Sequence, residues 1–143
     1  MKMKFTFLMS LSIAFAVQAN EFKGKEANDR YSGANWVRMQ AESNYPQFIQ
    51  FAPGKTIPAE KLNAWFKSLT KVPGFSIVTE REEQDRLGQT HVDYAITYQR
   101  IPFEHDDFKA HFQNGEVFRV NGEFDLSKPV GRVPVLTEQA ARV

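Results

Sequence analysis

The sequence contains no cysteine among its 143 residues. This absence excludes a disulfide framework, a cysteine nucleophile and a lipid-modified cysteine behind a leader segment. A domain without disulfide bonds depends on its own hydrophobic core, and the 13 phenylalanines of this chain are ample material for one. The sequence therefore predicts a fold stabilised by packing.

The sequence also lacks the short motifs that carry common catalytic chemistry. It has no H-E-x-x-H zinc helix, no glycine-rich phosphate loop and no G-x-S-x-G nucleophile elbow. These absences remove the residue patterns that self-sufficient hydrolases and phosphate-binding enzymes need. We therefore expect a chain that is not an enzyme, with no catalytic residue, no metal and no cofactor.

Charge of one sign is not in excess, since 18 basic residues stand against 17 acidic ones. Nucleic-acid-binding domains usually carry a basic surface and a high pI, so that class of partner is not expected. Lys2 and Lys4 precede an apolar run that ends in small residues at Ala19. This pattern predicts a signal peptide over residues 1–19, too short for a membrane span. We therefore expect an exported protein, periplasmic or extracellular, with no other membrane contact.

The stretch from Gly88 to Gly122 has the clearest strand pattern. Apolar residues recur at every second position at Val92, Tyr94, Ile96 and Tyr98, and again at Phe108, Ala110 and Phe112. A period of two indicates strands with one apolar face. Asn114-Gly115 then precedes a third run over residues 116–120, and this dipeptide favours the type I′ turn of a hairpin. The stretch predicts three antiparallel strands.

The helix pattern is clearest over residues 58–71. An apolar stripe with helical spacing is formed by Leu62, Trp65, Phe66 and Leu69. Pro58 suits a first helical turn, and Pro73-Gly74 ends the segment. We expect the stripe to lie in the core and not to form a ligand site, because aromatic residues at this spacing are usually buried.

The remaining segments complete an α+β prediction. Strands are expected at 47–51 and from Phe75, with charged residues 79–86 forming a solvated strand end or a loop. The fold class is an antiparallel sheet of four to five strands with one amphipathic helix on one face. The expected divisions of the chain are a signal peptide (1–19), a flexible leader (20–45), the α+β domain (46–124), a linker (125–135) and the start of a following module (136–143).

Two groups of polar residues are candidate metal or acid–base sites. In the predicted pairing His91 and His111 approach one another, but no third ligand stands at a fixed spacing, so we favour hydrogen-bonded or surface histidines over a zinc site. Residues 104–107, Glu-His-Asp-Asp, are interpreted as a solvated bend between two strands.

The stretch from Gly88 to Gly122 resembles the thermolysin/fungalysin-type propeptide domain, the FTP domain, and the resemblance covers roughly residues 46–124. The family pattern is Leu-Gly-x-Thr-His, spaced tyrosines, an Ile/Val-Pro step, a second histidine and a closing Gly-x-Val-x-x-Val-x-Gly. The matching residues are Asp85, Leu87, Gly88, Thr90, His91, Tyr94, Tyr98, Ile101, Pro102, His111, Gly115, Val117, Val120, Asn121 and Gly122. One departure is Arg100, which stands where the family usually has glycine. Residues from Leu136 resemble the start of a PepSY module.

Within this resemblance we assign structural roles to the motif residues. Gly88, Gly115 and Gly122 are expected to supply turns with positive φ. Tyr94 and Tyr98 are expected on the apolar side of their strand, with His91 on the opposite side. Pro102 is expected to bend the chain between strands.

The resemblance implies a non-catalytic exported domain that assists folding of a thermolysin-like zinc metallopeptidase, inhibits it, or both. It would act either as part of a truncated prosegment or in trans. The alternative is a stand-alone exported module that binds proteins or peptides and has lost its peptidase partner. A weaker third hypothesis is a small metal-binding protein that uses His91 and His111.

Overall fold

The computed structural model describes residues 20–127. The predicted signal peptide (1–19) and the predicted start of a second module (136–143) lie outside the described residues, as does the linker from residue 128 onward.

Eight strands and three short helical segments follow one another along the described residues. In chain order they are β1 (Glu21–Lys23), α1 (Lys25–Arg30), β2 (Ala34–Met39), β3 (Pro46–Phe51), β4 (Ile57–Pro58), the 3-10 helix η1 (Ala59–Lys61), α2 (Leu62–Ser68), β5 (Phe75–Gln84), β6 (Thr90–Tyr98), β7 (Ile101–Gln113) and β8 (Glu116–Glu123). None of the helices within residues 20–127 has the length and apolar character that a membrane crossing requires.

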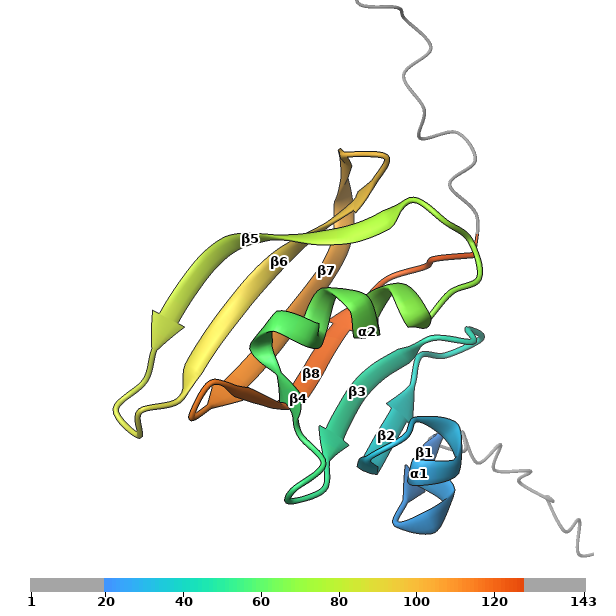
Figure 1. The fold of residues 1–143 in the computed structure, drawn as a ribbon. Helices are drawn as coiled ribbons and strands as arrows, with labels where there is room; N and C mark the ends of the chain where they lie inside the picture. The colour runs from blue at the N-terminus through green and yellow to red at the C-terminus, as the bar shows by residue number, and fades with distance from the viewer. Residues whose placement is uncertain (1–19, 128–143) are drawn as a thin grey trace, which may run out of the picture.

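The strands form one antiparallel sheet in the order β1-β2-β3-β8-β7-β6-β5, and β4 pairs with β8 (Figure 1). The predicted α+β class is confirmed. The predicted count of four to five strands is wrong, because the sheet has eight strands. Short strands such as β1 and β4 span too few residues to show an alternation of apolar and polar side chains.

The helix α2 crosses one face of the sheet, as Figure 1 shows. Leu62 and Phe66 are buried, and Trp65 and Leu69 pack against the same core. The Phe66 ring lies 5.0 Å from the Phe108 ring of β7. The α-helix is shorter than the predicted 58–71, since its first turn is the 3-10 helix η1 and it ends at Ser68.

The flexible leader predicted for residues 20–45 is wrong. β1 pairs with β2 and thereby extends the sheet at its edge. Ala27 of α1 and Val37 of β2 are fully buried in the main core cluster, and Phe22 packs against it. The sequence did not indicate these elements, because their few buried residues are separated by polar ones and elements of three to six residues show little periodicity.

The linker predicted from residue 125 begins too early. Leu126 is fully buried in the core, and its backbone carbonyl accepts a hydrogen bond from Thr70 Oγ1 at 3.0 Å. The predicted domain of residues 46–124 therefore extends in both directions. The spacing of prolines and glycines predicts a linker, but it does not indicate that one leucine of the segment, Leu126, is buried in the core.

Two tight turns connect β6, β7 and β8. Asn114 and Gly115 have φ angles of 52° and 77°, which agrees with the predicted type I′ hairpin. A second two-residue turn, not predicted, joins β6 to β7 with φ angles of 48° at Gln99 and 70° at Arg100. Neither residue is glycine or asparagine, so the usual signal for this turn is missing from the sequence.

The predicted bend at residues 104–107 lies within β7. Ala95 pairs with Asp107 and Thr97 pairs with Pro102, so residues 103–106 stand opposite Ile96 alone. The segment is a large irregular bulge within the continuous strand β7, and it carries its acidic side chains at the surface. Pro102 does not bend the chain between strands, because the reversal is complete at Arg100 and Pro102 is already paired.

Candidate functional site

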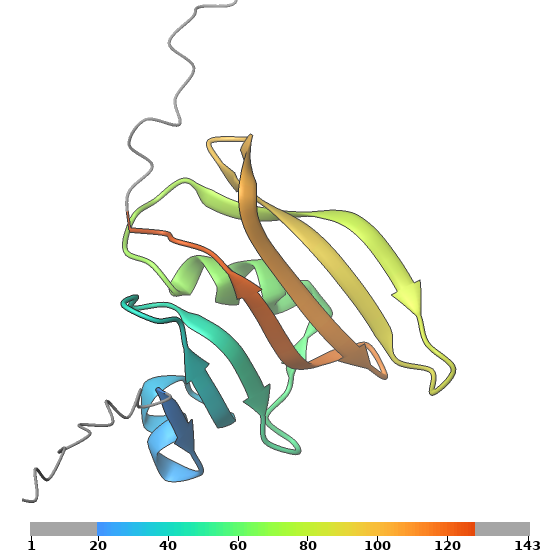
Figure 2. The same cartoon turned by 180° about the vertical axis from the view of Figure 1, so that it is seen from behind.

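The face of the sheet opposite α2 carries most of the polar motif residues. Phe108 contacts α2, and its register partners Tyr94 and Gly122 share its face. Successive side chains alternate between the two faces of a strand, so residues such as His111 lie on the other side. None of the described elements covers this second face, seen in Figure 2 with α2 behind the strands. We call it the open face.

One row of paired residues crosses the open face from strand to strand. The row consists of Lys23, Trp36, Gln50, Arg119, His111, His91 and Glu83, each paired with the next. The row runs across the sheet from β1 to β5, and its residues Lys23 and Arg119 are 96 positions apart in the sequence. Antiparallel strands lie about 5 Å apart, so neighbours in the row are within contact distance.

A chain of hydrogen-bonding groups occupies the β5–β8 half of this row. His91 Nε2 lies 3.0 Å from Asp85 Oδ2, and His91 Nδ1 lies 2.6 Å from His111 Nδ1. His111 Nε2 lies 2.6 Å from Asn121 Oδ1. Asp85 Oδ1 also accepts hydrogen bonds from the backbone N–H groups of Leu87 and Gln89, which fixes the turn between β5 and β6.

The protons in this series of hydrogen-bonding groups can be counted. A neutral imidazole carries one N–H, so two neutral rings supply two protons for three contacts. The outer contacts use both, since Asp85 and Asn121 each present an oxygen. With the Asn121 oxygen facing His111, a hydrogen bond between the two Nδ1 atoms needs one proton more than two neutral rings carry.

The surroundings of His111 disfavour a positive charge on its ring. Burial lowers the pKa of His111, and the neighbouring charges of His91, Arg119 and Lys109 lower that pKa further against the opposing effect of the Asn121 hydrogen bond. The hydrogen bond from His91, with the backbone N–H groups of the turn, lowers the pKa of Asp85. The lowered pKa keeps the Asp85 carboxyl ionised to a more acidic pH than usual.

Aromatic and cationic side chains occupy the β1–β3 half of the open face. The rings of Trp36 and Phe48 lie 4.8 Å apart. Arg38 lies over both rings, at 5.7 Å and 5.9 Å, and Lys23 lies 5.2 Å from Trp36. These side chains are half-buried or exposed. Cation–π contacts of this kind hold long basic side chains flat against a sheet.

A β-bulge in β8 brings Arg119 into this aromatic group. His111 pairs with Arg119 while Phe112 pairs with Val117, so Phe118 is the extra residue of the bulge. Bulges redirect side chains, and here the Phe118 ring contacts the His111 ring at 6.3 Å. The Arg119 guanidinium lies 5.5 Å from the Phe48 ring and 5.6 Å from the Phe118 ring. Arg119 thus links the aromatic half of the face to the histidines.

Two of the neighbouring cations have carboxylate partners. Arg38 Nε lies 2.9 Å from Glu21, and Lys109 Nζ lies 2.9 Å from Asp93. No ion pair joins Arg119 to a carboxylate of residues 20–127. Its Nη2 lies 3.4 Å from Gln50 Oε1, near the limit for a hydrogen bond, and its Nε is buried without a partner.

The predicted turn glycines have two different roles. Gly88 and Gly115 have φ angles of 78° and 77°, as turns require. Gly122 is not in a turn and its φ is not positive, which corrects the prediction. It pairs with Phe108, and a Cβ atom at this position would overlap the Asp107 carbonyl of β7. Gly122 is needed for the close approach of two strands.

The other motif residues lie mainly on the covered face. Tyr94 and Tyr98 are half-buried and pack against the core, the first 5.9 Å from the Phe108 ring and the second 5.2 Å from the Phe75 ring. Thr90 begins β6 opposite Phe112. Among motif residues of β6 and β7, the structure therefore brings His91 and His111 together and leaves the tyrosines apart from them.

Metal binding has no support from the geometry of the described residues. Within residues 20–127 no three His, Cys, Asp or Glu side chains are grouped so as to hold a metal ion. His105 lies on the bulge of β7 and takes no part in the His91–His111 pair. The two paired rings direct nitrogen atoms at each other and at Asp85 and Asn121, not at a common point.

Comparison with family models matches residues 76–124 to the Fungalysin/Thermolysin Propeptide Motif. This segment is an FTP motif. It contains nearly all of β5 and all of β6, β7 and β8, and so the His91–His111 pair and Arg119. Searches of curated proteins and of solved structures found no match.

Sequence reasoning missed the aromatic and basic half of the open face, which combines β1–β3, outside the FTP motif, with Phe118 and Arg119 inside it. Trp36, Phe48 and Arg119 come from three separate strands, and only the sheet order places them together. Phe118 and Arg119 are adjacent in sequence yet share one face, which breaks the period-two rule through the bulge. A usable signal was the alternation in β3, where Phe48 and Gln50 flank the buried Ile49.

Proposed function

We propose that this chain is a propeptide-like domain that binds a thermolysin-like zinc metallopeptidase, assists its folding and inhibits it, in cis or in trans. The observation that carries the proposal is the FTP motif over residues 76–124, which comprises the β5–β8 side of the sheet. In this proposal the domain contributes binding and no catalytic group.

The fold supplies a suitable binding surface. The sheet is held rigid by the core beneath α2, while the half-buried aromatic and basic side chains of the open face are exposed enough to contact a partner. A domain that binds the native peptidase better than the unfolded chain stabilises the native state by mass action. The same contacts inhibit the enzyme if they cover its active-site cleft.

Export is part of the proposal, since a prosegment is made with a secreted enzyme. The signal-peptide pattern over residues 1–19 supports it. We place the chain in the periplasm or outside the cell.

The test is to add the purified chain to a secreted thermolysin-like peptidase, both in its active form and during refolding from denaturant. The proposal predicts a concentration-dependent loss of peptidase activity, a higher refolding yield, or both. A sample of the chain unfolded in acid and digested with trypsin serves as the control for nonspecific protein effects. Unchanged activity and unchanged yield over a wide range of concentrations would refute the proposal.

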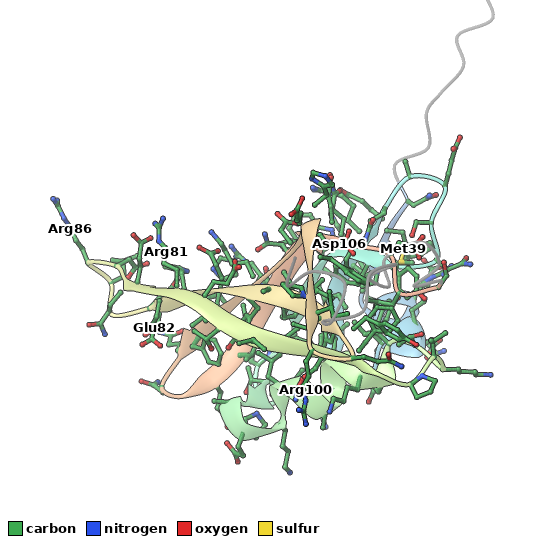
Figure 3. The ribbon with its side chains drawn as sticks, turned by 90° about the horizontal axis from the view of Figure 1, so that it is seen from above. Met39, Arg81, Glu82, Arg86, Arg100 and Asp106 are labelled. Atoms are coloured by element: carbon green, nitrogen blue, oxygen red, sulfur yellow. The ribbon has the colours of Figure 1, made fainter. Side chains whose placement is uncertain are left out.

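The exposed edge of β5 favours the alternative, a stand-alone module that binds peptides or proteins. β5 is the last strand of the sheet and is ten residues long, so a peptide strand has space to pair with it. Its C-terminal half carries the charged residues Glu80, Arg81 and Glu82. Figure 3 shows Arg81 and Glu82 on opposite sides of the strand. Charges on both faces oppose edge pairing, so we rank this function second. Recovery of envelope peptides and no peptidase in a pull-down would reverse the ranking.

A further inference from the structure

From the unpaired guanidinium on the open face we infer that Arg119 is the anchor for an acidic side chain of the protein partner. Resting on the proposed function, the inference specifies that an Asp or Glu on the folded surface of the peptidase forms an ion pair with Arg119, between the Phe48 and Phe118 rings.

The first argument is the difference between Arg119 and its neighbours. Arg38 and Lys109 lie on the same face, and each already has a carboxylate of this chain at 2.9 Å. Arg119 has only the amide oxygen of Gln50, at 3.4 Å. An arginine offers five N–H donors in a planar fork that matches a carboxylate, so this site has donors in excess of acceptors.

The second argument is burial. Arg119 Nε is inaccessible to solvent and has no hydrogen-bond partner among the described residues. Trp36 Nε1, two strands away in the same row, is also buried without a partner. A buried donor without an acceptor costs free energy. Arg119 as a whole is only partly buried, so an incoming carboxylate can reach the terminal N–H groups of the guanidinium, which have one weak acceptor within residues 20–127.

The third argument is preorganisation. Contacts with Phe48 and Phe118 hold the guanidinium at 5.5 Å and 5.6 Å from the two ring centroids. A fixed side chain loses little entropy when it binds. Arginine and aromatic residues at the centre of a half-buried patch are the residue types that dominate binding energy at protein interfaces.

The charges around Arg119 favour an acidic partner. His111 lies beside it in the row, and Lys23 lies three strands away beyond Trp36. Glu21 and Asp93 on this face pair with Arg38 and Lys109. Asp107 and Glu123, beside Phe48, accept hydrogen bonds from the Glu123 backbone N–H and the Gln47 amide. A basic side chain arriving at the same point would be repelled.

The first experiment needs no peptidase. The full chain is labelled with ¹⁵N, and the Nε–H resonances of Arg119 and Arg38 are followed while glutamate blocked at both backbone ends is added to tens of millimolar. Blocked glutamine is the uncharged control. We expect the Arg119 signal to shift with glutamate alone and the Arg38 signal, already paired with Glu21, to stay in place. Equal shifts, or none at Arg119, overturn the inference.

The second experiment uses a secreted thermolysin-like peptidase and four forms of the chain. Arg119→Gln is expected to weaken binding about tenfold or more, and Arg119→Lys to weaken it less, since the charge remains but the fork is lost. Lys109→Gln, on the same face, is the matched control and should change affinity less than threefold. Circular dichroism verifies that each variant is folded.

The outcomes separate the inference from the proposed function. If all variants bind the peptidase equally, the anchor is refuted and the proposed function stands. If the wild-type chain does not bind while glutamate shifts Arg119, the peptidase is excluded as partner and the carboxylate chemistry of Arg119 is supported. Equal losses for Arg119→Gln and Lys109→Gln would show general charge attraction and overturn the anchor.

Discussion

The imidazole rings of His91 and His111 meet across β6 and β7 with their Nδ1 atoms 2.6 Å apart. With Asp85 and Asn121 as outer partners, this contact is a hydrogen bond only when the pair holds one proton more than two neutral rings. A second additional proton would set two N–H groups against each other. Protonation of both rings would therefore break this contact between the two strands.

Acid should weaken the fold through His111. Its pKa is lowered by burial from an ordinary value of 6.5, so the unfolded chain binds this proton more readily than the folded one. Its contribution to stability is present above pH 6.5 and is lost as pH falls from there toward the lower folded pKa. Denaturant unfolding between pH 7.5 and pH 5 measures the slope.

The matched variants for this prediction are His111→Gln and His105→Gln. His111→Gln should remove the dependence of stability on pH in that window. His105 is exposed on the bulge of β7, so its variant should keep the dependence of the wild-type chain. The same slope in all three proteins would contradict the account. Asp85 does not confuse the measurement, because its pKa is lowered from 3.8 and its contribution is lost only at more acidic pH.

Arg100→Gly should stabilise the protein by about 1 kcal/mol. Arg100 has a φ of 70°, a left-handed conformation that glycine adopts without strain, and glycine is the residue usual at this position of the resembling family. Arg100→Ala removes the same side chain and retains the strain, so it should not stabilise. Chemical denaturation of the two variants makes the comparison. A gain in both would assign the effect to charge.

Gly122→Ala should destabilise the protein by about 1–3 kcal/mol, because the added methyl group must displace the backbone of β7 at Asp107. Gly88→Asn is the control within the same motif. Gly88 has space around it, and asparagine accepts a left-handed φ, so we expect a change below about 0.5 kcal/mol. Thermal unfolding of both variants decides the matter, and equal stability would disprove the close approach.

Phe66→Ala should destabilise the protein by about 3–5 kcal/mol, since the ring is fully buried between α2 and the sheet. The adjacent Lys67→Ala is the control, because Lys67 is exposed. Guanidinium unfolding followed by tryptophan fluorescence gives both values. A small effect at Phe66 would mean that α2 does not cover the core.

The sequence predicted the parts of the fold with long, regular patterns. The strands of residues 90–113, the Asn114-Gly115 turn and the stripe of α2 all have the periodicity or the turn residues that their geometry requires. The turn at Gln99 and Arg100 was missed because both residues adopt positive φ against their own preference. Such a turn is imposed by the pairing of β6 with β7, which is tertiary information.

The candidate site was predictable only in part, for the same reason. His91 and His111 followed from the register of one predicted hairpin pair. Arg119 and Phe48 are 71 positions apart, and their contact depends on β3 lying beside β8. The β1–β2 extension that supplies Trp36 rests on a few apolar anchors in a polar segment. Local patterns do not encode such strand order.

The central claim is that the open face binds a thermolysin-like peptidase. Hydrogen–deuterium exchange of the full chain, alone and with an excess of inactive peptidase, tests it most directly. We predict slower exchange in β3, β7 and β8 around Phe48, His111 and Arg119, with unchanged exchange in α2. Protection confined to α2 or to the edge of β5, or no protection at all, would contradict the account.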